Sequence, residues 1–138
     1  MMRIVVDTNV LVSGILFGGR PAELIRFVLM HAVSAVATQE IIEEYQSTLD
    51  YLLEKYGGRK VSIPLDIICS AMEIIPVQSR VKVCRDPDDD KFISCAVDGG
   101  CVFIVSGDKD LLSLERYADV EILTVAQFLD RLQKPPVA

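Results

Sequence analysis

Short apolar runs alternate with amphipathic stretches along most of this chain. Five runs have the length and composition of β-strands: residues 3–6, 33–37, 74–77, 102–105 and 121–123. Apolar residues recur at helical spacing between and after these runs, in residues 22–32, 39–56 and 64–72 and after Asp90 and Thr124. Strands that alternate with helices predict a three-layer α/β/α fold, in which helices cover both faces of a central parallel sheet of about five strands.

Turn and capping residues stand at the expected boundaries. Pro21 fits the first position of a helix, and Thr38 and Thr124 are suitable N-caps. The pairs at residues 57–58 and 99–100 are both Gly-Gly, which is typical of helix ends. No repeat or linker interrupts this order, so we predict a single domain over residues 1–134 and a frayed tail at residues 135–138.

The composition favours a packed globular protein. Of the 138 residues, 51% are hydrophobic, but no apolar run approaches the roughly 18 residues of a membrane helix. Residues 10–17 could form the core of a signal peptide, but Asp7 precedes them and no basic region or cleavage site is evident. The four cysteines form no CxxC pair and His31 is the only histidine, so we expect reduced thiols, no structural zinc and a cytoplasmic protein.

Acidic residues follow the apolar runs at the points where strands should end. Asp7 comes directly after residues 4–6, and Asp108 and Asp110 come just after residues 102–105. The carboxyl ends of parallel strands meet at one edge of the sheet, so these acids should converge on one crevice. Clustered carboxylates repel one another unless a cation lies among them, which favours a divalent metal site.

A second group of acids, at residues 86–90, begins the helix after Asp90. Asp86 can cap this helix with Pro87 at its first position, and Asp88 and Asp89 complement the helix dipole. We therefore interpret these three acids as capping residues. Asp90 differs because it lies two residues before the apolar pair 92–93, and we predict that it faces the sheet.

The net charge of −6 and the pI of about 4.7 argue against a nucleic-acid partner, because phosphate binding depends on Lys and Arg. However, seven of the twelve aspartates lie between Asp86 and Asp110. The negative charge is thus concentrated, and bound divalent cations would invert the local field.

Four segments together resemble the PIN-domain nucleases. Residues 7–10, Asp-Thr-Asn-Val, look like the opening motif of that family, and residues 38–45 resemble its second motif, in which Glu44 is the matching acid. Residues 90–96 are similar to the third motif and residues 105–111 to the fourth. The run at residues 85–92, Arg-Asp-Pro-Asp-Asp-Asp-Lys-Phe, is typical of the branch of VapC-like toxin components of toxin–antitoxin pairs.

This resemblance implies cleavage of RNA phosphodiesters that depends on Mg²⁺ or Mn²⁺. Asp7, Asp90 and either Asp108 or Asp110 would hold the metal, and Glu44 would bind a second ion or orient the attacking water. Supporting roles are expected for Thr8, Asn9 and Ser106. Contacts to the RNA backbone are expected from Arg20, Arg85, Lys91 and Lys109. The resemblance also implies a homodimer and a small antitoxin partner.

Two other readings of the acids remain open. A metal-dependent phosphatase acting on a small substrate would use similar carboxylates, although Asp7-Thr8-Asn9 lacks the second acid of the Asp-x-Asp pair of haloacid-dehalogenase phosphatases. A non-catalytic metal-binding interaction domain would also keep them. No Ser-His-Asp or Cys-His arrangement is available, since His31 is solitary, so we expect no covalent intermediate.

Overall fold

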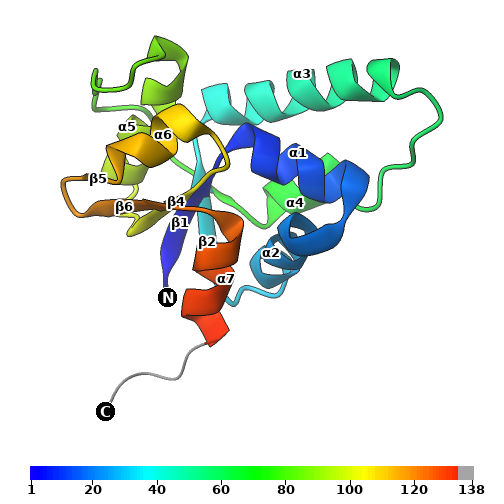
Figure 1. Cartoon of the computed structure of the whole chain (residues 1–138), viewed down its shortest axis with the longest axis horizontal. Helices are drawn as coiled ribbons and strands as arrows, with labels where there is room; N and C mark the ends of the chain where they lie inside the picture. Colours follow the sequence, from blue (N-terminus) through cyan, green and yellow to red (C-terminus); the bar gives the residue numbers. More distant parts are fainter. Residues whose placement is uncertain (134–138) are drawn as a thin grey trace.

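The computed structural model describes residues 1–133, and its centre is a six-stranded sheet with the strand order β3-β2-β1-β4-β6-β5 (Figure 1). All neighbouring strands run parallel except β5, which is antiparallel to β6. The strands are β1 (Arg3–Val6), β2 (Ser34–Ala37), β3 (Glu73–Ile74), β4 (Phe103–Val105), β5 (Arg116–Tyr117) and β6 (Val120–Leu123).

Seven helices surround the sheet within residues 1–133. They are α1 (Thr8–Phe17), α2 (Gly19–Leu29), α3 (Gln39–Lys55), α4 (Leu65–Ser70), α5 (Asp90–Asp98), α6 (Lys109–Leu114) and α7 (Val125–Gln133), and a short 3₁₀ helix, Pro87–Asp89, precedes α5. Figure 1 shows α5 and α6 on one side of the sheet and α1, α2 and α4 on the other. The predicted three-layer α/β/α fold is thus confirmed.

Some elements differ from the prediction. The strand expected at residues 74–77 is only the two residues of β3, because Pro76 cannot donate to a sheet ladder. The sheet gains β5, which turns back onto β6 through Ala118 in a left-handed conformation (φ 52°). Helices α1 and α6 were not predicted. The expected tail at residues 135–138 lies outside the described residues.

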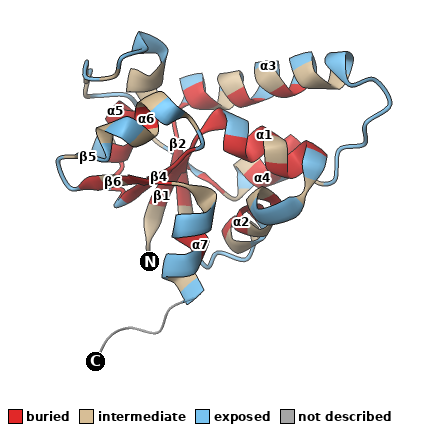
Figure 2. Ribbon diagram, in the orientation of Figure 1, coloured by how far each residue is buried: buried red, intermediate tan, exposed pale blue. Residues whose placement is uncertain are grey.

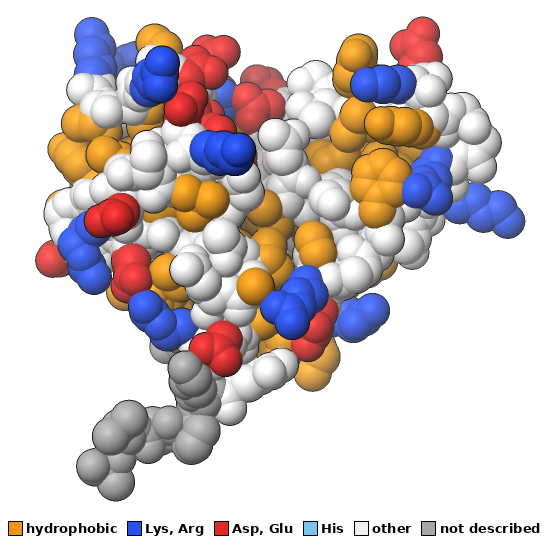
Figure 3. All heavy atoms as spheres, viewed as in Figure 1, with side chains coloured by type: hydrophobic (Ala, Val, Ile, Leu, Met, Phe, Trp, Pro, Cys, Tyr) orange, Lys and Arg blue, Asp and Glu red, His pale blue; other side chains and the backbone are white. Residues whose placement is uncertain are grey.

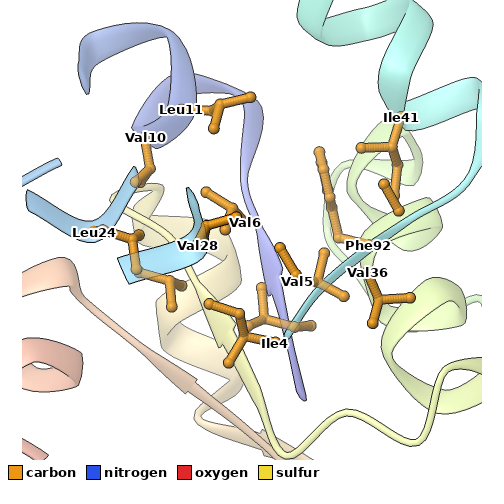
Figure 4. Packing of buried hydrophobic residues seen from close by; sticks show 14 of the residues in the cluster. Ile4, Val5, Val6, Val10, Leu11, Leu24, Val28, Val36, Ile41 and Phe92 are labelled. Carbon is orange, nitrogen blue, oxygen red and sulfur yellow. The ribbon is translucent and has the colours of Figure 1, made fainter. Parts of the chain in front are cut away.

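The core forms around β1, whose residues Ile4, Val5 and Val6 are all buried. Figure 2 shows buried residues along the strands and on the inward sides of the helices. In Figure 4, Leu11 and Val28 approach β1 from one helical layer and Phe92 from the other. Within residues 1–133, no helix is long and apolar enough to cross a membrane.

The strand order fixes where a ligand can approach. The chain moves from β1 to β2 and β3 on one side of the sheet, whereas β4 lies on the other side of β1. The winding therefore reverses between β1 and β4, and we call the region outside their carboxyl ends, where open α/β sheets bind ligands, the crevice. The acids that follow these two strands lie at this crevice.

Candidate active site

Asp7 and Ser106 form the centre of the candidate site. Val6 and Val105 are partners in the parallel register of β1 and β4, so the next residues of both strands emerge side by side. The Asp7 backbone N–H donates to the Val105 carbonyl (2.9 Å), and the Ser106 hydroxyl donates to Asp7 Oδ2 (2.7 Å). Asp7 is only 5% exposed, and Ser106 holds its carboxylate in one orientation.

Asp108 and Asp110 differ in their surroundings. The Asp108 N–H donates to the Ser106 hydroxyl (3.0 Å), which draws Asp108 toward Asp7. Asp108 Oδ1 also accepts from the Asp110 N–H (3.3 Å) and so caps α6. The charge of Asp108 acts on both Asp7 and Asp89, whereas Asp110 lies in the first turn of α6. Of the two acids, the structure therefore brings Asp108 to the crevice.

The third acid at the crevice is Asp89. Its carboxyl lies within hydrogen-bonding reach of Asp108 and feels the charge of Asp7. Asp89 makes no side-chain capping bond at the start of α5, so the predicted capping role is not seen. The signal was present in the sequence: Asp89 lies three residues before Phe92 and four before Ile93, and thus continues the buried stripe of α5.

Asp90 is held by backbone groups of a neighbouring loop, and its predicted role as a metal ligand stays a prediction. Its Oδ1 accepts from the backbone N–H groups of Val83 (3.0 Å) and Cys84 (2.8 Å). Burial acts to raise the pKa of Asp90, but the two N–H donors outweigh it and lower that pKa. Asp86, by contrast, caps as predicted, since its Oδ1 accepts from the Asp88 N–H (3.0 Å).

Glu44 connects the crevice to two neighbouring helices. The Thr8 hydroxyl, at the start of α1, donates to Glu44 Oε2, and Lys91 of α5 forms an ion pair with Glu44 Oε1 (2.6 Å). The Lys91 ammonium also donates to the Asp88 carbonyl (2.8 Å). The next residue, Tyr45, is fully buried and donates to the Val6 carbonyl (2.5 Å), which ties α3 to the end of β1.

Burial, and to a smaller extent the charges of neighbouring acids, raise the pKa values of Asp7 and Asp89. Burial is the main cause for Asp7, and the hydrogen bond from Ser106 opposes it. The pKa of Asp89 rises to about 7, because of burial first and then because of its hydrogen bond with Asp108 and the charges of Asp108 and Asp7. Asp89 therefore holds a proton more readily than a free aspartate does.

The donor set suits a hard divalent cation, which prefers carboxylate oxygens. Within residues 1–133, no three His, Cys, Asp or Glu side chains converge closely enough in this arrangement to hold a metal ion. Besides burial, the charge of Asp108 raises the pKa of Asp7 and of Asp89, and the charge of Asp7 raises that of Asp89, so a cation between these residues would relieve repulsion. The residues at the crevice therefore fit a divalent metal by chemistry.

The other predicted residues lie at different distances from the crevice. Asn9 is exposed and lines a pocket of about 340 Å³ together with Gly107 and Asp108. Arg20 lines a separate pocket with residues of α7, away from the acids. Arg85 and Lys109 are exposed, while Lys91 is half-buried in its ion pair with Glu44.

A comparison with known families shows which family the chain belongs to. The profile of the PIN domain family matches residues 3–110, which include every acid described above. The chain belongs to the PIN domain family. PIN domains are generally nucleases, and PIN domain nucleases generally use divalent metals. The family predicted from the four motifs is thus confirmed.

The chain is also similar to a whole protein of unassigned role. It is 29% identical to the uncharacterized protein MJ1680 of Methanocaldococcus jannaschii, over 145 aligned positions that cover 96% of this chain and 93% of that protein. The similarity therefore extends over nearly the full length of both chains. The name of this relative gives no support for a toxin role.

Proposed function

We propose that this PIN domain is a metal-dependent endoribonuclease that hydrolyses RNA phosphodiesters with a water molecule. The observation that carries the proposal is the gathering of Asp7, Asp89 and Asp108 at the point where the winding of the sheet reverses. These residues would hold a Mg²⁺ or Mn²⁺ ion. When bound, such an ion supplies an acidic water and neutralises the charge that develops on the phosphate.

The remaining residues of the site orient the carboxylates. The Ser106 hydroxyl donates to the Asp7 carboxylate and accepts from the backbone N–H of Asp108, so it links the two residues. Thr8 and Lys91 hold the two oxygens of Glu44 from opposite helices. We propose that Glu44, oriented in this way, accepts a hydrogen bond from the attacking water. No side chain in this set is required as a covalent nucleophile.

The test compares purified wild type with Asp7→Asn on a structured RNA and on a chromogenic phosphate monoester. We expect the wild type to cleave RNA with Mn²⁺ or Mg²⁺ and to stop with a chelator. Asp7→Asn should reduce the rate on the order of a hundredfold, because it removes a buried charge from the metal site. Full activity of Asp7→Asn on RNA, or hydrolysis of the monoester alone, would overturn the proposal.

We further propose that the protein is the toxin of a toxin–antitoxin pair, acts as a homodimer and binds a small antitoxin at the acidic crevice. The resemblance of residues 85–92 to toxin components supports this role. The four free cysteines favour a cytoplasmic setting, where thiols stay reduced. A short neighbouring gene whose product forms a stable complex with this chain and blocks RNA cleavage is the expected result. Absence of growth inhibition on expression of the chain alone would contradict a toxin role.

A further inference from the structure

An extended segment outside α5 is held by one face of that helix. We call residues 77–84 the strap; it has neither helical nor strand structure. Asp90, Ser94 and Asp98 are spaced four residues apart on α5, so their side chains share one face. Each of the three accepts hydrogen bonds from the strap.

The anchoring contacts run the length of the strap. Asp98 Oδ2 accepts from the N–H groups of Gln78 and Ser79 (both 2.9 Å), and its Oδ1 accepts from the Ser79 hydroxyl (2.6 Å). Ser94 Oγ accepts from the Val81 N–H (3.0 Å). With the two bonds to Asp90 described above, the backbone of the strap is fixed at both ends and in the middle.

This anchoring determines where the side chains of the strap point. Successive side chains of an extended chain alternate in direction. Ser79 and Val81 are half-buried against α5, whereas Arg80 and Lys82 between and after them are exposed. Within residues 1–133 neither cation forms a salt bridge, although the charge of Lys82 lowers the pKa of Asp90.

The two cations border a pocket that adjoins the acidic crevice. The pocket has a volume of about 590 Å³ and lies between the strap, the start of α3 and the start of α5. Arg80, Lys82 and Lys91 all line it, and Lys91 also contacts Glu44 of the crevice. Val77 and Val81 add apolar surface, while the exposed acids Glu40 and Asp88 and the half-buried Asp90 also line the pocket.

Arg80 and Lys82 offer positive charge to a polyanion on an otherwise acidic protein. The chain carries a net charge of −6, so an RNA strand is repelled by most of its surface. Figure 3 shows basic side chains gathered at the upper left, over the segment that lies beside α5, next to a group of acidic side chains. A polyanion that reaches the acids needs an attractive contact beside them, and the strap offers Arg80 and Lys82 on a backbone that is already ordered.

We propose that the strap is the phosphate-binding part of the substrate site, where Arg80 and Lys82 hold the backbone of single-stranded RNA next to the scissile bond. The proposal rests on the proposed function and deepens it. The pocket combines apolar, cationic and acidic residues, and an unpaired nucleotide would lie in it with its phosphate toward Arg80 and Lys82, in keeping with the way proteins bind splayed single strands. Arg80 and Lys82 are thus positioning residues.

The test uses the full chain with Arg80→Ala/Lys82→Ala and, as a matched control, Arg26→Ala/Lys60→Ala, which removes the same charge from exposed positions on α2 and after α3. We measure kcat and KM on single-stranded RNA across a series of salt concentrations. The strap variant should raise KM about tenfold with a much smaller change in kcat, and should make the salt dependence of log KM shallower by about 1.4. The control should leave both values near wild type.

A binding assay keeps the two proposals separable. The Kd for labelled single-stranded RNA is measured by fluorescence anisotropy with a chelator present, which requires no cleavage. Weaker binding by the strap variant alone supports the strap even if the wild type cleaves nothing, an outcome that would overturn only the nuclease. Equal effects of both double variants, no RNA binding by wild type, or tighter binding of double-stranded RNA would each overturn the strap proposal.

Discussion

Asp89 and Asp90 are neighbours in the chain, yet helical geometry sends their carboxylates in different directions. Asp89 shares the stripe of Phe92 and Ile93 and reaches Asp108, while Asp90 shares the face of Ser94 and holds the strap. Asp89 therefore belongs to the proposed metal site, whereas Asp90 stabilises the structure of the strap. Which residue does which follows from the helical period of 3.6 and not from residue type.

Substitution by alanine should separate these two roles. Asp89→Ala should lower metal-dependent RNA cleavage on the order of a hundredfold while leaving stability unchanged or higher, because a repelled carboxyl is removed. Asp90→Ala leaves two backbone N–H groups without their acceptor and should cost about 1–3 kcal/mol of unfolding free energy. Urea denaturation and an RNA cleavage assay measure the two effects. If Asp90→Ala lowered activity and Asp89→Ala lowered stability, Asp90 would be the acid of the active site.

The raised pKa of Asp89 also predicts how stability changes with pH. An unfolded aspartate titrates near 3.9, whereas Asp89 titrates at about 7 in the fold. Between these values the folded state binds a proton that the unfolded state releases, so stability falls as pH rises toward 7. Between pH 5 and pH 8, wild type should lose about 1–2 kcal/mol relative to Asp89→Asn, since water screens the half-buried pair. A pH-independent difference in urea denaturation without divalent metal would contradict this.

Sequence reasoning located the site acids that follow strands and missed contacts between distant segments. Asp7 and the pair Asp108 and Asp110 were predicted because the ends of β1 and β4 must meet at one edge of the sheet, but the sequence did not decide between Asp108 and Asp110. The contact of Lys91 with RNA stays a prediction, and the structure adds an ion pair between Lys91 and Glu44 that the sequence did not indicate. That pairing depends on how α3 and α5 pack, and a single sequence contains no direct signal for it.

At the scale of elements, the burial of α1 explains why this helix was not predicted. Most of its residues are buried, since α2 and α3 both pack against it, and it has no polar stripe that would reveal a helical period. The strap was not predicted either, because its sequence follows neither the helical nor the strand period. Side chains of α5 accept hydrogen bonds from the backbone of the strap, in the way that a neighbouring strand would.

The tight packing of α1 on α2 depends on Gly14. A Cβ at this position would lie 2.6 Å from Ile25 Cδ1 and 2.8 Å from the backbone carbon of Pro21. The backbone of α2 cannot move aside without shifting the helix, so Gly14→Ala should destabilise the protein by about 1–3 kcal/mol. Gly57→Ala is the control, because its Cβ would enter open space. Thermal unfolding of both variants makes the comparison, and an equal Tm would show that the two helices tolerate separation.

At the scale of the whole molecule, charge is distributed for a polyanionic substrate within an acidic protein. The acids concentrate at the crevice and around α5, while cations of the strap and Lys91 line the neighbouring pocket. Metal binding would reduce the repulsion at the crevice, so the ion should matter to the fold as well as to the reaction. The folded state should therefore bind divalent metal and gain stability from it.

Thermal unfolding with and without Mn²⁺ tests this coupling. A metal that binds only the folded state and is present at 100 times its Kd adds about 2.7 kcal/mol of stability, which for a domain of this size raises Tm on the order of 10 °C. The rise should be smaller at pH 6 than at pH 8, because a proton on Asp89 competes with the metal. Asp7→Asn should abolish it, whereas Asp119→Asn, an exposed acid in the turn between β5 and β6, should keep it. An equal rise in Tm in both variants would show that the metal binds elsewhere. No rise in Tm of wild type at any metal concentration would contradict metal binding at the crevice.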